Sequence, residues 1–337
     1  MSSLYTIASR AHRVSFTTIE RLLPAHLTVL CYHRITDRSS PEFYGYPPNA
    51  SATPENFATQ LDYLKRNYSV IKLESLVEWA RGSASLPHRP LLITFDDGYR
   101  DNLTQAIPAL EAKGLSAVFF IATKFVGGMS AFPWDYAANA ISNSTRSGTV
   151  ALPLIGMTDL DINRMATTRR FVGMLQNLTG YESENVLNAL SKVLDVPPLG
   201  KAPDGLHLTW DDLRTMSKNG HAISAHTVSH PNLGIIPPEQ AKFEIKQSRA
   251  AIEKKLGVSV ISFAYPYGRE KHYTPDAESE LARQGFSFAF SSRGGFGFVN
   301  EIRTRPFAMR RVMIGYRDIG DKFIAKIALG ARLRGRS

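Results

Sequence analysis

The sequence has a single cysteine, Cys31, among its 337 residues. It therefore forms no internal disulfide and holds no cysteine-rich zinc module. No apolar run approaches the roughly 20 residues of a membrane-spanning helix. Residues 1–26 read as a helical segment, but Arg10, His12 and Glu20 interrupt it, so it lacks the continuous apolar core of a signal peptide. These absences lead us to expect a cytoplasmic protein.

Positive charge is in excess and is concentrated near the C-terminus. The formal net charge is +10 at pH 7, and residues 301–337 hold ten Lys or Arg against three Asp or Glu. Nucleic acid is not an expected partner, because the sequence contains no zinc-finger or RNA-recognition motif. Residues 323–336 mix apolar and basic side chains at helical spacing, which fits either a solvated terminal helix or a helix on a membrane surface. The basic tail, residues 321–337, is therefore a candidate for peripheral membrane contact.

Short apolar runs alternate with helical stretches along most of the chain. Seven runs have the continuous apolar character of buried parallel strands, and residues 309–314 are a further candidate. The seven runs are residues 27–32, 69–73, 91–95, 116–122, 221–225, 260–265 and 286–291. Thr53 and Thr209 suit the beginnings of helices, and Gly257 suits a helix end. The alternation predicts an α/β fold with a mainly parallel sheet.

Polar residues follow several of these runs directly, at the carboxyl ends of the expected strands. They are His33, Asp96, Asp97, His226 and Tyr267. Enzymes with (β/α) barrels gather their chemistry on that face, so we favour a closed or nearly closed barrel over an open doubly wound sheet.

One segment, residues 130–208, is much longer than a crossover helix requires. Within it, residues 161–179 and 184–194 have a helical pattern, so we expect a helical insertion on the barrel. The predicted organisation is an N-terminal helical segment (1–26), a barrel (27–320) carrying the insertion, and the basic tail.

The stretch 91–101, LLITFDDGYRD, places two carboxylates side by side after an apolar strand. Neighbouring carboxylates repel, and burying one without a partner costs several kcal/mol, roughly. Water at a surface turn would relieve the repulsion, since Asp-Gly is common turn chemistry. A bound cation would relieve it too. The stretch alone leaves both explanations open.

Two histidines, His226 and His230, lie four residues apart in the stretch HAISAHTVSHP. One helical turn would bring both imidazoles to the same side, and Pro231 limits the helix to about that length. The spacing alone is weak evidence in a chain with nine histidines. With an aspartate from the carboxylate pair, however, it makes a His₂-carboxylate set with an open position for water. The combination favours a metal centre.

Three motifs resemble those of the polysaccharide deacetylases, the NodB-type carbohydrate esterases of family four. They are TFDDG at 94–98, HTVSH at 226–230 and YPYG at 265–268; YHRI at 32–35 and LTWDDLRTMSKNG at 208–220 also look like that family. The resemblance covers roughly residues 29–269 without the insertion. It implies a distorted (β/α)₇ barrel of the NodB type, a divalent metal, and hydrolysis of N-acetyl groups on an amino-sugar oligo- or polysaccharide.

The resemblance also implies roles for individual residues. The metal ligands would be Asp97, His226 and His230, and Asp96 would be the general base. Zinc is the first choice for this ligand set, with cobalt, manganese, nickel and iron as alternatives. The substrate-binding residues expected from the third motif are Tyr265, Pro266, Tyr267 and Gly268. Aromatic faces suit a sugar ring, so the candidates to extend that surface are Trp134, Phe132 and Phe296.

Two positions depart from the commonest family pattern. Many relatives place a general-acid histidine late in the domain, but no histidine follows His272 here, and we expect His33 to supply the acid. The arginine that often supports the base is replaced by Ala264. The candidates to replace that arginine are Arg303, Arg305, Arg310 and Arg311, among which the sequence does not choose.

Two other functions stay open at this point. One is an esterase that acts on O-acetyl groups of a carbohydrate. The other is a catalytically silent carbohydrate-binding or membrane-associated scaffold. The intact carboxylate pair and both histidines argue against the scaffold.

Overall fold

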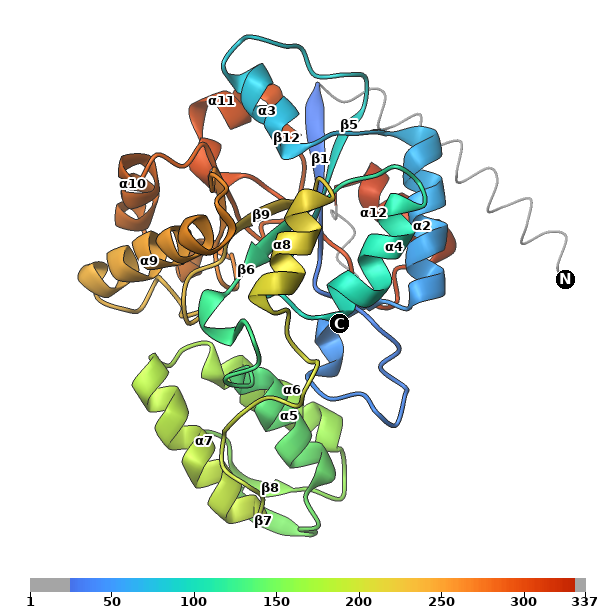
Figure 1. The fold of residues 1–337 in the computed structure, drawn as a ribbon. Helices are drawn as coiled ribbons and strands as arrows, with labels where there is room; N and C mark the ends of the chain where they lie inside the picture. The colour runs from blue at the N-terminus through green and yellow to red at the C-terminus, as the bar shows by residue number, and fades with distance from the viewer. Residues whose placement is uncertain (1–24, 331–337) are drawn as a thin grey trace, which may run out of the picture.

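The computed structural model describes residues 25–330 (Figure 1). Nearly all of the expected N-terminal helical segment lies outside the described residues, as do residues 331–337 of the basic tail. Across the described range, no helix combines the length and the apolar character that crossing a membrane requires.

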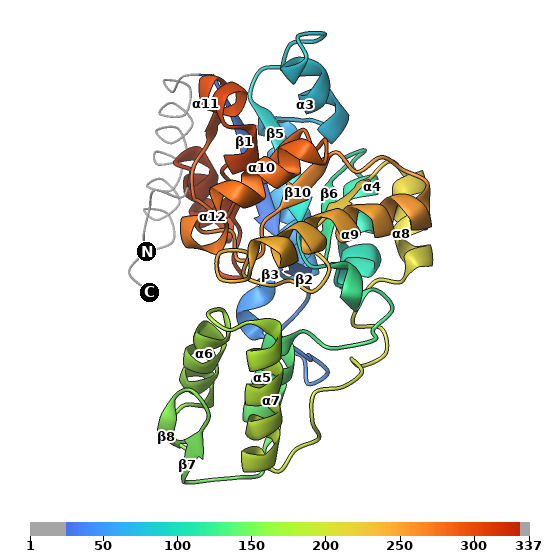
Figure 2. The same ribbon diagram turned by 90° about the vertical axis from the view of Figure 1, so that its left-hand side faces the viewer.

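A curled, mainly parallel sheet forms the centre of the fold (Figures 1 and 2). Its strands pair in the order β11–β10–β9–β6–β5–β1–β12, while β4 pairs with β5 and β13 with β1. The bounds are β1 (His26–Tyr32), β4 (Ser69–Val70), β5 (Pro90–Phe95), β6 (Val118–Ile121), β9 (Ala222–Ala225), β10 (Ser262–Ala264), β11 (Phe288–Phe290), β12 (Gly297–Phe298) and β13 (Val312–Met313). Phe290 also forms a parallel bridge with Met309, just before β13, which draws the two ends of the sheet together. The predicted α/β barrel architecture is confirmed.

Helices surround this sheet. They are α2 (Pro54–Asn67), α3 (Leu73–Ala80), α4 (Ile107–Glu111), α8 (Trp210–Lys218), α9 (Pro238–Leu256), α10 (Pro275–Arg283), α11 (Val299–Thr304) and α12 (Gly320–Ala328). Most of them cover its outer face, whereas α3 and α11 contribute side chains to the apolar cluster inside the barrel. Thr53 and Thr209 cap the N-termini of α2 and α8 as predicted, and Gly257 ends α9 in the left-handed conformation. A pair of two- and three-residue strands, β2 (Arg34–Ile35) and β3 (Ala50–Ala52), follows β1.

Strand side chains alternate between two environments. In β5, Ile93 and Phe95 join the main apolar cluster with residues of α2, α4 and α9, whereas Leu92 joins a second cluster with side chains of other strands and of α3. Thr94 and Asp96 continue the face of Leu92, because side chains two residues apart point the same way. The Asp96 side chain therefore points into the interior of the barrel, directly after the carboxyl end of β5.

Residues 130–208 form a lobe beside the carboxyl ends of the strands (Figure 1, lower part; Figure 2). The lobe contains α5 (Pro133–Asn143), β7 (Thr149–Leu152), β8 (Gly156–Asp159), α6 (Arg164–Leu175) and α7 (Gly180–Leu194). Its apolar side chains, among them Phe171, Leu187 and Leu190, form a cluster that also includes Tyr99 and Phe125 of the barrel. The sequence predicted helices near α6 and α7 but not the β7–β8 hairpin. Both hairpin strands are short and mostly exposed, so they carry no apolar alternation.

The described part of the basic tail is packed on the domain. In α12, Phe323 and Ile327 are buried within the main apolar cluster, and the Phe323 ring meets Tyr63 of α2 edge-on. The apolar side chains of this helix therefore face the protein. They do not support the expected membrane contact through this part of the tail.

Candidate metal centre and catalytic site

Three of the predicted ligands converge at the carboxyl ends of β5 and β9. The Nε2 atoms of His226 and His230 each lie 3.5 Å from Oδ1 of Asp97. One donor atom from each residue lies within 4.8 Å of the others, and all three side chains are buried. For bonds of about 2.0–2.1 Å, tetrahedral geometry separates ligand atoms by roughly 3.3–3.4 Å. The observed spacing therefore suits one shared divalent cation.

The hydrogen bonds of these residues also fit a cation. Asp97 Oδ1 is buried and has no hydrogen-bond partner within residues 25–330. His226 Nδ1 donates to the carbonyl oxygen of Ala264 over 2.7 Å, so Nε2 is the nitrogen that faces Asp97 and that carries the lone pair when the imidazole is neutral. A buried acceptor without a donor is costly, and a metal ion would satisfy it.

The loop that carries the two histidines is not the helical turn that the sequence suggested. Thr227 and His230 have positive φ angles of 67° and 58°, and the segment between them is a bend. Glu244 of α9 holds this bend from behind, because its carboxylate accepts hydrogen bonds from the N–H groups of Val228 and Ser229 and from the Ser229 hydroxyl (2.6–2.9 Å). The imidazoles converge through a strained loop braced by a buried carboxylate.

The two aspartates both reach one cavity, although they are adjacent in the sequence. Asp96 ends the extended strand, but Asp97 has a φ of 78° and is followed by Gly98 at 92°. This turn redirects the Asp97 side chain, which would otherwise point away from Asp96. Of the seven non-glycine residues with positive φ in the described chain, four belong to this site: Asp97, Thr227, His230 and Tyr267. Such concentrated strain is typical of functional sites.

Asp96 is paired with Arg311, one of the four arginines that the sequence could not separate. Two hydrogen bonds of 2.7 Å join the guanidinium to the two carboxylate oxygens, and both side chains are buried. Arg311 also donates to the carbonyl oxygen of Ser291 and to Thr94. The Cys31 thiol lies 3.4 Å from Asp96 Oδ2 and donates to it. The other three arginines do not contact Asp96: Arg303 lies over the Trp79 ring, Arg310 pairs with Glu301, and Arg305 is on the surface.

Burial and neighbouring charge set the protonation of this cluster. Burial alone would raise the pKa of Asp96, but Arg311, aided by His226, lowers it well below its ordinary value. Burial also opposes ionisation of Asp97, whose pKa is nevertheless lowered by the surrounding imidazoles. Burial and the neighbouring His226 lower the pKa of His230 to about 3. The site therefore offers ionised carboxylates and a neutral His230, which is the form that binds metals.

The remaining predicted residues are distributed around a cavity of about 100 Å³, here called the catalytic cavity. His33, Asp96, Asp97, Tyr265 and Tyr267 line it together with both histidines of the candidate metal set, His226 and His230. Pro266 and Gly268 form the turn behind Tyr267, where the Gly268 N–H donates to the Pro266 carbonyl. A Cβ on Gly268 would lie 2.5 Å from the backbone nitrogen of Ser292, so this position requires glycine.

Of the additional aromatic candidates, only Trp134 reaches the cavity. Its ring lies 4.7 Å from the His230 ring, and the fully buried ring of Phe132 stacks on it. Phe296 packs instead on His26, at the amino end of β1, so its predicted role is wrong.

A buried network that the sequence did not reveal holds Trp134. Trp134 Nε1 donates to the Tyr99 hydroxyl (2.9 Å), which donates to Oδ2 of Asp135 (2.7 Å). The other Asp135 oxygen accepts from the Tyr46 N–H. Burial raises the pKa of Asp135 to about 6, against the opposing effect of Arg34. No short motif marks this network, because Tyr46, Tyr99 and the adjacent pair Trp134 and Asp135 come from three separate segments.

Comparison with known proteins agrees with this geometry. Residues 83–288 match the family model of polysaccharide deacetylases. The protein YxkH of Bacillus subtilis (strain 168), named as a polysaccharide deacetylase, is 19% identical over 305 residues, which are 90% of this chain and 77% of that protein. The chain belongs to the polysaccharide deacetylase family. This membership implies a hydrolase that acts on acetylated carbohydrate.

Solved structures share the fold over most of the chain. The Streptococcus pyogenes deacetylase PplD, in complex with acetate, gives a TM-score of 0.59 at 17% identity, covering 90% of this chain and 99% of that one. IcaB from Ammonifex degensii gives 0.55 at 21% identity, covering 90% and 97%. A de-N-acetylase from Aggregatibacter actinomycetemcomitans gives 0.57 at 16%, covering 90% and 100%. These matches confirm the NodB-type barrel.

Proposed function

We propose that the protein is a metal-dependent deacetylase that removes N-acetyl groups from an amino-sugar oligo- or polysaccharide. The observation that carries the proposal is the convergence of two sets on one cavity. Asp97, His226 and His230 form the candidate metal set, and Asp96 with Arg311 forms the candidate base. We propose zinc as the metal, because two imidazoles and one carboxylate with an open position are typical of catalytic zinc; cobalt, manganese, nickel and iron are the alternatives.

When bound, the cation supplies Lewis acidity, which lowers the pKa of water and polarises the acetyl carbonyl. Asp96 accepts the proton of the attacking water as general base. Arg311 keeps Asp96 ionised before the reaction and holds its carboxylate in one orientation. The backbone N–H of Tyr267 is our candidate to donate to the developing oxyanion.

The amine that leaves needs a proton, and we assign its delivery to His33. This residue lines the catalytic cavity beside Asp96 and Asp97. Its backbone is fixed on both sides, since its N–H donates to the Ser51 hydroxyl and its carbonyl accepts from Asn102. The imidazole therefore enters the cavity from an anchored position after β1.

Acetate release from N-acetylglucosamine oligomers is the direct test. We expect release that a chelator abolishes and added metal restores. Absence of release from N-acetylated substrates, with metal shown to be bound, would reject the proposal; turnover of O-acetylated glycans alone would point to the esterase. The cytoplasmic location expected from the sequence stays a prediction.

A further inference from the structure

A second cavity lies between the insertion and the barrel, next to the catalytic cavity. Its volume is about 270 Å³. We propose that this insertion pocket binds the sugar unit adjacent to the one that loses its acetyl group. The inference rests on the proposed function, because it names how that site would hold a chain substrate.

The two cavities share one wall. Five residues line both: Trp134, Val172, Gln176, His230 and Tyr267. Two of them, His230 and Tyr267, belong to the barrel, and the other three belong to the insertion. A ligand group in the catalytic cavity and one in the insertion pocket would therefore touch the same side chains. Two cavities that share a wall suit successive units of one chain better than two unrelated ligands.

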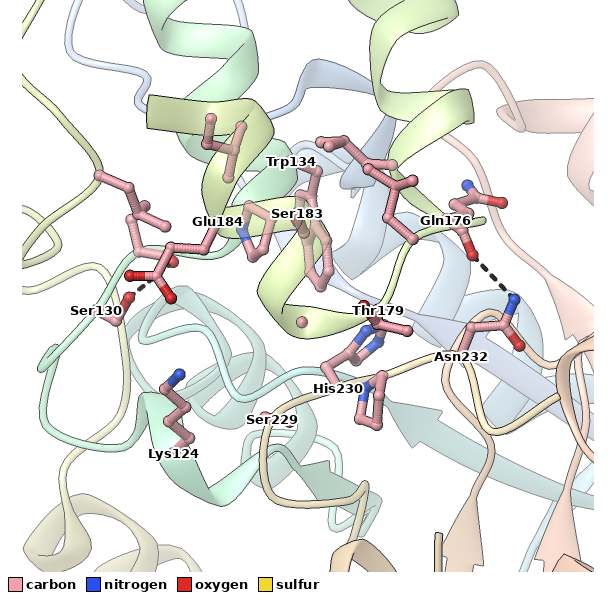
Figure 3. A pocket seen from close by; sticks show the side chains of 18 of the residues that line it. Lys124, Ser130, Trp134, Gln176, Thr179, Ser183, Glu184, Ser229, His230 and Asn232 are labelled. Atoms are coloured by element: carbon pink, nitrogen blue, oxygen red, sulfur yellow. Dashed lines mark hydrogen bonds between the residues drawn. The ribbon is translucent and has the colours of Figure 1, made fainter. Parts of the chain in front are cut away.

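The lining has the mixed chemistry that a pyranose ring requires. Its apolar part includes Phe125, Val172, Leu175, Leu187 and Leu199. Its polar part includes Lys124, Thr179, Ser183, Glu184, Ser229 and Gln240. Figure 3 shows Ser183 and Glu184 on the insertion side of the pocket and Lys124, Ser229 and His230 on the barrel side. A sugar ring pairs apolar faces with a rim of hydroxyl groups, so both kinds of lining find partners.

Both sides of the pocket are fixed. Asn232 is buried two residues after His230, and its Nδ2 donates to the carbonyl oxygen of Gln176 at the end of α6 (2.9 Å; Figure 3). This bond ties the insertion to the loop that carries a metal-site histidine. On the other side, the Tyr99 hydrogen bond and the stacked Phe132 hold the Trp134 ring. A preorganised pocket binds its ligand with less ordering cost.

The charges at the rim favour an uncharged unit. Lys124 and Glu184 line the pocket from opposite sides, both are exposed, and their charges are opposite. Neither sign dominates, so a uronic acid gains no net attraction. We therefore assign the pocket to a neutral hexopyranose, such as a second N-acetylglucosamine unit.

Direct binding to N-acetylglucosamine oligomers of one to five units, in β-1,4 and β-1,6 linkage, tests the inference. Calorimetry on the zinc-loaded protein with Asp96→Asn prevents turnover during titration. We expect a dimer or longer chain to bind at least about tenfold more tightly than the monomer. Ser183→Trp, which fills the pocket from α7, should remove that gain.

A second variant avoids the buried position of Ser183. Gln240→Trp, on the exposed surface of α9, narrows the mouth without disturbing the core and should also reduce the gain. Gln247→Trp is the matched control, since it is the same change at an exposed position of the same helix outside the pocket. Equal affinity for monomer and longer chains, or an unchanged gain in Ser183→Trp and Gln240→Trp, would overturn the inference. Failure of the proposed function is distinguishable, because it appears as binding without acetate release by the wild-type protein.

Discussion

Arg311 and Asp96 lie 215 residues apart in the sequence and are joined inside the barrel by two hydrogen bonds of 2.7 Å. Arg311 lies between Met309, which forms a bridge with Phe290 of β11, and β13, which pairs with β1. This short segment closes the sheet. The closure of the fold and the ionisation of the proposed base thus depend on the same short segment.

Replacing Arg311 by Met should damage both stability and catalysis. Removing one partner of a buried ion pair leaves the other charge uncompensated, which costs about 3–5 kcal/mol in the free energy of unfolding. The pKa of Asp96 should rise, so the acidic limb of the pH–rate profile should move to higher pH. We expect kcat/KM to fall at least about a hundredfold. Chemical denaturation and a pH series of initial rates measure these effects.

Arg310→Met is the control, because Arg310 is partly exposed in its ion pair with Glu301. Such a pair contributes about 0–1 kcal/mol. Equal losses in the two variants would contradict a special role for Arg311.

Metal content should depend on the three converging side chains. We expect wild-type protein loaded with zinc and then desalted to retain about one equivalent. Asp97→Ala and His226→Ala should retain little metal, while His88→Ala should match wild type, since His88 is exposed and outside the site. Elemental analysis gives the answer. Full metal retention by Asp97→Ala would exclude this site as the metal centre.

Glu244 should act on metal affinity from a distance, as a positioning residue. Its carboxylate braces the bend between the two histidines without facing the cation set. Loss of such an outer support typically lowers metal affinity about 10–100-fold. A competition titration with a chelating dye measures this for Glu244→Ala. Glu239→Ala, an exposed carboxylate on the same helix, should leave the affinity unchanged; a similar fall in both would show a general effect of charge.

His33→Ala should separate amide from ester hydrolysis. An amine needs a proton to leave, whereas an alkoxide leaves more easily. We expect a fall of about 10²–10⁴ in kcat on N-acetylated substrate and a much smaller one on an O-acetyl ester. Parallel assays on both substrates measure the ratio. Small and equal losses would remove His33 as the acid.

Asp135 should make folding stability depend on pH. Its pKa is about 6 in the folded protein against an ordinary value of 3.8, because burial disfavours the charged carboxylate. The folded state therefore holds the proton more tightly. This contribution is fully present below about pH 3.8 and is lost as the pH rises through about 6, a change of about 3 kcal/mol. Denaturation of wild type and Asp135→Asn between pH 4 and 7 should show a smaller decline in the variant. Parallel curves would contradict the assignment.

The sequence predicted those parts of the fold and site that depend on local pattern. Apolar runs located the main strands, and the residues directly after them supplied Asp96, Asp97 and His226. One structural expectation was wrong in detail. His226 and His230 meet through a bend with positive φ angles at Thr227 and His230, and not through the helical turn that their spacing suggested.

The unpredicted parts depend on tertiary contacts. Arg310 and Arg311 are adjacent and directly precede the two-residue strand β13. Arg311 is buried inside the barrel and Arg310 is partly exposed, but a stretch this short has no apolar pattern that shows which of the two is buried. The Trp134–Tyr99–Asp135 network joins the insertion to the turn after β5. The β7–β8 hairpin is mostly exposed, so it has no apolar signature.

The central position of β1 has a consequence for dividing the gene. The stretch that matches the family model, residues 83–288, contains every ligand of the candidate metal set. A fragment with those limits would nevertheless lose β1, which pairs with β5, β12 and β13. It would also lose His33, which precedes residue 83, and Arg311, which follows residue 288. Such a fragment would keep the family motifs, yet it would expose the edge of β5 and lack both the proposed acid and the guanidinium that pairs with Asp96. If His33 and Arg311 have the roles proposed for them, the smallest active unit is considerably longer than the stretch that matches the family.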